Sequence, residues 1–143
     1  MMWIVAAAAA LASGSSLIQL DPFAQATSGI ASCPAARPRL YTTEAAGAQA
    51  HARSERGTRC AMEGTCEPGG AYRRDSEINE AVRAAIAGKP RFGSSSVWLT
   101  TSRRWVTLEG CVATKAQRDA LVKFVTAQPR VERVFDELRV GTR

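Results

Sequence analysis

Residues 97–112 read VWLTTSRRWVTLEGCV, and this stretch decides the fold. Apolar and polar residues alternate on both sides of Ser102-Arg103, which is the pattern of two half-buried strands joined by a tight turn. The sequence therefore predicts a β-hairpin with strands at 97–101 and 105–112.

The register of this hairpin determines which side chains face the core. A two-residue connection at Ser102-Arg103 places Leu99 opposite Val106 and Val97 opposite Leu108, with all four facing inward. Successive side chains of a strand point to opposite faces. The other face is then formed by Trp98, Thr100, Trp105, Thr107 and Cys111. Two tryptophans are therefore expected outside the core.

A helix is predicted before the hairpin, from about Ser76 to Ala87. Asp75 or Ser76 can cap its free amides, and Gly88 followed by Pro90 ends it. Its apolar residues share one stripe, which must face a core. They are Ile78, Val82, Ala85 and Ile86.

A second helix and a last strand follow the hairpin. Thr114 and Gln117 form a capping box, and the helix is expected to stop near Ala127, before Pro129. Strand 131–140 then returns parallel to the second hairpin strand, because the connection is long enough for a right-handed crossover.

The order of these elements predicts the fold class. We expect an α/β (α+β two-layer) domain of order αββαβ, with a three-stranded mixed sheet and two helices on one face. The sheet positions expected to hold this structure together are Val106, Leu108, Val134 and Leu138. Gly110 is expected where a helix approaches the sheet or where the strand bulges.

These motifs, taken in order, resemble the BON domain of bacterial envelope proteins. Its opening helix has an acidic residue and two apolar residues four apart, and its second strand has the form V-T-L-x-G-x-V. Its last strand has the form V-x-x-V-x-N-x-L-x-V. The matching residues in this chain are Asp75, Ile78, Val82, 106–112, Val131, Val134, Leu138 and Val140.

The chain departs from the family pattern at its turns. Arg130 and Asp136 stand where the family usually has Gly and Asn, and Ser102-Arg103 replaces its usual Asp-Gly turn. The resemblance covers residues 75–141. It implies association with phospholipid surfaces and a role in envelope integrity or osmotic-stress tolerance.

The first 26 residues have the features of an export signal. An apolar run from Trp3 to Ala12 is too short for a membrane span, and Ala24-Gln25-Ala26 supplies small residues for cleavage. We therefore expect a signal peptide at 1–26 and a periplasmic or envelope location. The alternatives are a membrane anchor, formed by an uncleaved N-terminus or by a lipidated Cys33.

Residues 27–74 have few large apolar side chains, and no helical or strand period connects them. Burial of so little apolar surface would not offset the entropy lost on ordering the backbone. The sequence therefore predicts a flexible tether, with at most a transient helix at 45–52.

The chain has four cysteines and one histidine, and in an exported protein an even cysteine count favours disulfides. We favour a Cys60–Cys66 bridge. The alternatives are a Cys33–Cys111 bridge and a Cys111 that is simply a small apolar strand residue. His51 lies in the predicted tether, where packing cannot position it for catalysis. The sequence thus predicts no enzyme activity, no cofactor and no metal site.

The chain contains 19 basic and 13 acidic residues, a net charge of +6. Trp98 and Trp105 with Arg103 and Arg104 are the membrane-binding candidates, because tryptophan favours the lipid interface and arginine attracts anionic phosphates. The alternatives are that the tryptophans pack across the strands, or are covered by the tether or by a second protomer.

The expected partner is anionic phospholipid. A protein-interaction module that docks another envelope protein, with self-association included, is the alternative. Nucleic-acid binding fits the basic charge, but the chain lacks the Gly-x-x-Gly clamp of KH domains and has an export signal, so we do not favour it.

Overall fold

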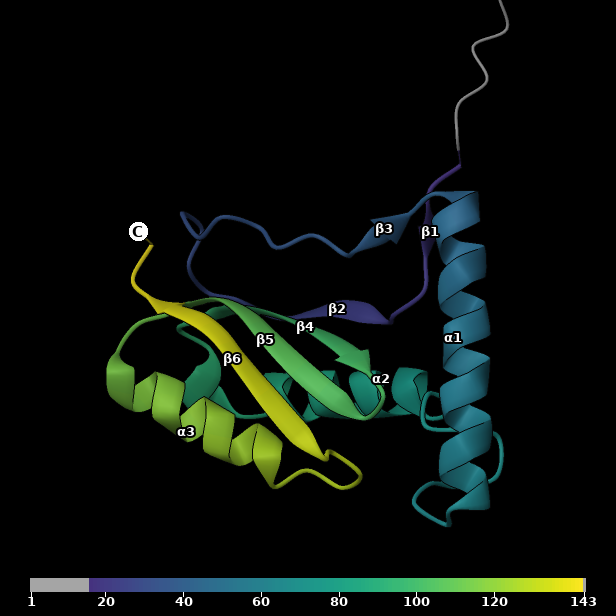
Figure 1. The fold of residues 1–143 in the computed structure, drawn as a ribbon. Helices are drawn as coiled ribbons and strands as arrows, with labels where there is room; N and C mark the ends of the chain where they lie inside the picture. Colours follow the sequence, from purple (N-terminus) through teal and green to yellow (C-terminus); the bar gives the residue numbers. More distant parts are fainter. Residues whose placement is uncertain (1–15, 143) are drawn as a thin grey trace, which may run out of the picture.

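The computed structural model describes residues 16–142 and shows an α+β fold (Figure 1). A mixed four-stranded sheet of order β2-β4-β5-β6 packs one face against two helices. The elements in chain order are β1 (Ile18–Gln19), β2 (Phe23–Ser28), β3 (Leu40–Tyr41), α1 (Thr43–Met62), α2 (Asp75–Ala87), a 3-10 turn (Pro90–Phe92), β4 (Ser96–Ser102), β5 (Trp105–Val112), α3 (Lys115–Thr126) and β6 (Arg133–Val140).

The predicted αββαβ unit is present, with α2 and α3 on one face of the sheet. β5 and β6 are parallel, as the crossover through α3 requires. Thr114 caps α3 by accepting from the amide of Gln117, whose own side chain accepts from the amide of Ala113. The predicted core positions of the sheet are buried, except Val134, which is half-buried at the margin.

The hairpin turn lies one residue later than predicted. Arg103 and Arg104 form it, with φ of 58° and 65°, the left-handed conformation that a two-residue hairpin turn needs at both positions. Leu99 therefore pairs with Leu108, and Val106 with Thr101. The predicted pairing is wrong by two residues, although each side chain keeps its predicted face because the shift is even.

Asp75 stabilises this turn, so its predicted role as the cap of α2 is wrong. Its two carboxylate oxygens accept the backbone amides of Arg103 and Arg104 at 2.8 and 2.9 Å. The residue at the N-cap is Arg74, which forms no capping bond. Asp75 is only 4% exposed. Burial raises the pKa of this carboxyl, and the two amide bonds oppose that rise.

The prediction of a three-stranded sheet is wrong, because β2 adds a fourth strand. β2 pairs antiparallel with β4, and the register shifts between Gln25 and Thr27. Ala24 and Ala26 are partly buried and pack against the core. The residues predicted for signal cleavage thus lie within a strand of the sheet. The apolar run that precedes them falls outside the described residues.

The flexible tether predicted for 27–74 is also wrong, because α1 occupies much of it. α1 begins after Thr42, whose hydroxyl caps the amide of Ala45. Only Ala46 and Gly57 are buried on α1, so apolar burial contributes little to its position. An ion pair between Arg53 and Asp21, with N and O atoms 2.8 Å apart, joins it to the segment before β2.

Gly110 lies in β5 with φ of 120°, and a Cβ there would be 2.1 Å from the carbonyl oxygen of Ser96. The close approach that excludes a side chain therefore comes from the neighbouring strand β4. The expectation of an approaching helix at this position is wrong.

Candidate functional site

The face of the sheet opposite α2 and α3 carries the candidate functional residues, and the N-terminal segment divides it into three regions. Residues 30–36 cover one end, and α1 stands beside the hairpin end (Figure 1). A cleft lies between these two ends. The BON-like unit alone therefore does not define this surface.

The covered end contains Trp98, which is only 8% exposed. It packs with the half-cystines Cys33 and Cys111 and with Phe23 and Ile30 of the N-terminal segment. The placement of Trp98 on an exposed face is therefore wrong, and the alternative of coverage by the N-terminal segment holds for this residue.

One disulfide ties the N-terminal segment to β5, and a second joins the last turn of α1 to the loop that follows it. Cys33 pairs with Cys111 at a Cα–Cα distance of 5.8 Å, and Cys60 pairs with Cys66 at 5.3 Å. Both pairings considered from the sequence are present together. A disulfide-bonded Cys33 has no thiol to carry a lipid, and Cys111 is a bridge residue as well as a buried strand residue.

The hairpin end carries a partly exposed aromatic pair flanked by arginines. Trp105 and Phe135 meet edge to face with their ring centroids 5.7 Å apart. The guanidinium of Arg103 lies 4.7 Å from the Trp105 ring centroid, and that of Arg133 lies 5.4 Å from it. We call Arg103, Trp105, Arg133 and Phe135 the aromatic–arginine patch.

The patch differs in membership from the predicted membrane-binding set. Arg104 points away into ion pairing with Glu132 and a bond from Nε to the carbonyl oxygen of Arg130. Phe135 and Arg133 belong to the patch because β6 runs parallel to β5, with Arg133 beside Trp105. Sequence analysis missed them because the register of a parallel pair is not readable from either strand alone.

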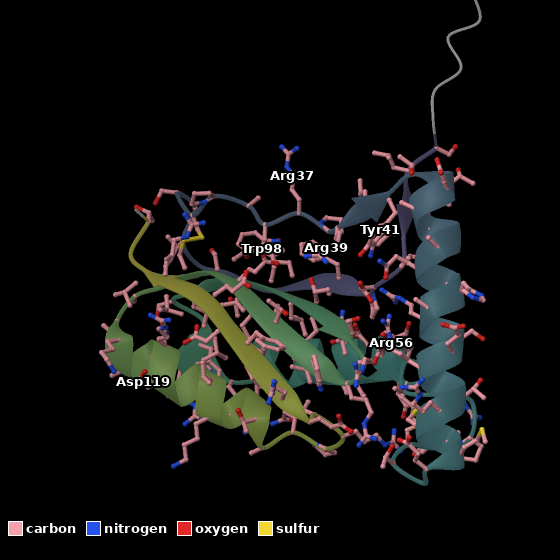
Figure 2. All side chains as sticks on the ribbon, in the orientation of Figure 1. Arg37, Arg39, Tyr41, Arg56, Trp98 and Asp119 are labelled. Carbon is pink, nitrogen blue, oxygen red and sulfur yellow. A yellow bond between two sulfur atoms is a disulfide. The ribbon has the colours of Figure 1, made fainter. Side chains whose placement is uncertain are left out.

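The region between the two ends is a polar cleft of about 520 Å³. Its floor is the sheet, and its walls are α1 and the segment that leads into β3 (Figure 2). Its charged groups are Asp21, Arg37, Arg39, Arg53, Arg56, Glu109 and Glu137. Tyr41 and Tyr72 add phenolic hydroxyls to the same walls.

Glu109 and Glu137 lie side by side on the cleft floor, because they are register partners in β5 and β6. Burial raises the pKa of Glu109, and the nearby charge of Glu137 raises it further. Arg39 lowers the pKa of Glu109 without forming an ion pair with it. The arginine wall and the carboxylate floor of the cleft therefore interact electrostatically without forming an ion pair.

His51 lies on the outer side of α1, where its Nε2 is 3.3 Å from a Glu55 carboxylate oxygen and both side chains are largely exposed. Among residues 16–142 there is no group of three or more His, Cys, Asp or Glu side chains arranged to hold a metal ion. In the same residues no helix is long and apolar enough to cross a membrane.

A hairpin followed by a helical crossover to a parallel third strand, with two helices on one face, defines a class of small α+β domains. Residues 74–142 match the BON domain family, so this chain contains a BON domain. BON domains are generally non-catalytic. A search of curated proteins finds no match to the chain. Phe23–Ser28, α1 and the residues that cover Trp98 all lie outside the matched range.

Proposed function

We propose that this protein is a non-catalytic envelope protein whose aromatic–arginine patch attaches the BON domain to anionic phospholipid membranes. The observation that carries the proposal is the pairing of the half-buried Trp105 ring and the exposed Phe135 ring with two arginines at one end of the sheet. In this proposal, such attachment supports envelope integrity and tolerance of osmotic stress.

The chemistry of the patch suits the lipid headgroup region. Phe135 is 38% exposed, and Trp105 presents an amphipathic ring of the kind that favours the membrane interface. Among residues 16–142, Arg103 and Arg133 form no ion pair, so both guanidiniums can bind lipid phosphates. Stacking on the rings holds them beside the apolar surface.

The two disulfides are consistent with an extracytoplasmic location, because such bonds persist in oxidising compartments. A periplasmic or envelope location, reached through an N-terminal export signal, is part of the proposal. It places the patch in the compartment where lipid surfaces are available.

Vesicle flotation tests the membrane proposal. The double variant Arg103→Gln/Arg133→Gln should bind anionic vesicles about 30-fold more weakly, since each arginine near an anionic surface contributes about 1 kcal/mol. The matched control is Arg59→Gln/Lys123→Gln, which removes two exposed charges elsewhere. An equal loss of vesicle binding in both variants would show that only net charge matters, and the patch would then be excluded as the membrane-binding site.

The aromatic pair requires a separate test. Trp105→Ala/Phe135→Ala should weaken binding even in high salt, because apolar insertion is not screened by ions. Circular dichroism should show an unchanged fold, since both rings are partly exposed. Full binding by this variant would refute interfacial insertion.

A protein-interaction module is the second candidate, favoured by the edge strand β6. Among residues 16–142, β6 pairs with β5 alone, so its other side has unpaired backbone groups that an added strand can use. Val140 at its end is 46% exposed. Concentration-dependent association in lipid-free sedimentation would support this function, whereas a monomer at every concentration would count against self-association.

A further inference from the structure

The polar cleft contains opposite charges on facing surfaces that do not pair with each other. Arg39 and Arg56 come from the N-terminal segment, whereas Glu109 and Glu137 come from the sheet of the BON domain. Figure 2 places Arg39 above the sheet and Arg56 on the side of α1 that faces it. We propose that this cleft binds a small soluble zwitterion, with its oxyanion on Arg39 and Arg56 and its ammonium group on Glu109 and Glu137.

The arginines keep their charge available for a ligand. Among residues 16–142, neither Arg39 nor Arg56 forms an ion pair. Arg56 donates Nε to the hydroxyl of Tyr72 at 3.0 Å, which orients the guanidinium and leaves its terminal nitrogens free. Its neighbour Arg53 is neutralised by Asp21, through contacts of 2.8 and 3.0 Å.

The two carboxylates of the cleft also keep their charge available for a ligand. Glu109 and Glu137 are adjacent in the parallel register, and neither forms an ion pair within the described part of the chain. Like charges directly opposite each other on a sheet are destabilising, typically by a few tenths of a kcal/mol. A bound ammonium group would remove this repulsion, which is why the pair suits a cation.

The combination of arginines on the walls and carboxylates on the floor favours a zwitterion over an ion with a single charge. A lone anion would meet the repulsion of the two carboxylates, and a lone cation that of the arginines. The hydroxyls of Thr100, Ser102 and Thr107 line the floor between the charged groups and suit the polar middle of such a ligand. A volume of about 520 Å³ lies within the usual range for small-molecule sites.

This site borders the aromatic–arginine patch but shares no residue with it and does not depend on membrane binding. It requires the N-terminal segment, since the arginine wall lies outside residues 74–142. The BON domain alone therefore supplies only the carboxylate half of the site.

NMR titration of the full chain, with both disulfides formed, tests the proposal. The probes are phosphoethanolamine and 4-aminobutyrate, which carry a phosphate and a carboxylate respectively, with inorganic phosphate and ethanolamine as single-charge controls. We expect saturable shifts at cleft residues with at least one zwitterion and weaker binding of both single ions. The pKa of Glu109 should fall when the zwitterion is bound, because an adjacent ammonium favours the ionised form.

Matched variants locate the binding. Arg56→Gln and Glu137→Gln should each weaken zwitterion binding roughly tenfold, the typical cost of one charge-assisted hydrogen bond. Arg59→Gln, on the same helix but outside the cleft, should leave it unchanged. The proposal is overturned if neither zwitterion gives saturable shifts, if inorganic phosphate binds as tightly, or if the cleft variants behave as Arg59→Gln does.

Discussion

The bond between Asp75 and the hairpin turn should be one of the larger single contributions to stability in this domain. Asp75→Ala removes two hydrogen bonds, at 2.8 and 2.9 Å, from a side chain that is 4% exposed. At about 1 to 1.5 kcal/mol each, their loss should lower the free energy of unfolding by about 2 to 3 kcal/mol. Asp75→Asn retains one acceptor oxygen, so it should cost about half as much.

Urea denaturation monitored by tryptophan fluorescence measures this effect. Ser76→Ala is the matched control, because the sequence alone assigns Ser76 the same capping role, whereas the structure places Ser76 inside α2 with Arg74 at the N-cap. The transition midpoint of Asp75→Ala should fall with an unchanged slope, and that of Ser76→Ala should barely move. A loss below about 1 kcal/mol for Asp75→Ala, or an equal loss for Ser76→Ala, would refute the reasoning.

Three further outcomes follow from the sheet. Burial, and next the charge of Glu137, raise the pKa of Glu109 in the folded protein. The contribution of Glu109 to stability is therefore present below its pKa in the unfolded chain and is lost as the pH rises through its pKa in the folded protein. Glu137→Gln should therefore stabilise the protein by about 0.5 kcal/mol near pH 7 and by nothing near pH 3 in urea titrations; a gain independent of pH would contradict this. Gly110→Ala should cost at least about 3 kcal/mol in the same assay, because φ is 120° and a Cβ would clash with Ser96, and a near-native midpoint would show that the strands can separate. If the leader is cleaved, mass spectrometry of the exported chain should find a mature N-terminus before Phe23, since a later cut would remove part of β2; a mature chain that begins within β2 and keeps the native melting temperature would show that this strand is dispensable.

The membrane proposal and the cleft proposal fail independently. Loss of vesicle binding on mutation of the patch says nothing about the cleft, whose charged groups come from other positions. A chain that binds zwitterions but not vesicles would retain the cleft and shift the role of the patch toward a protein partner.

The sequence by itself determined the local structure of the BON domain. Alternation in residues 97–112 specified the hairpin, and the Thr114 capping box specified the start of α3, because these signals act within a few residues of each other. The identity of the buried sheet residues followed from the same alternation. The shift of the turn to Arg103-Arg104 could not be read, because it depends on an acceptor 28 residues earlier in the chain.

Only the tertiary structure decided what the other face of the sheet presents. The sequence of β2 has no apolar alternation strong enough to predict a strand. β2 forms because β4 offers an edge with unpaired backbone groups. The Cys33–Cys111 bridge, 78 residues apart in sequence, then covers Trp98 and leaves Trp105 accessible. Contacts between distant segments decide such features, since the free energy that favours them is gained only when both partners are already folded.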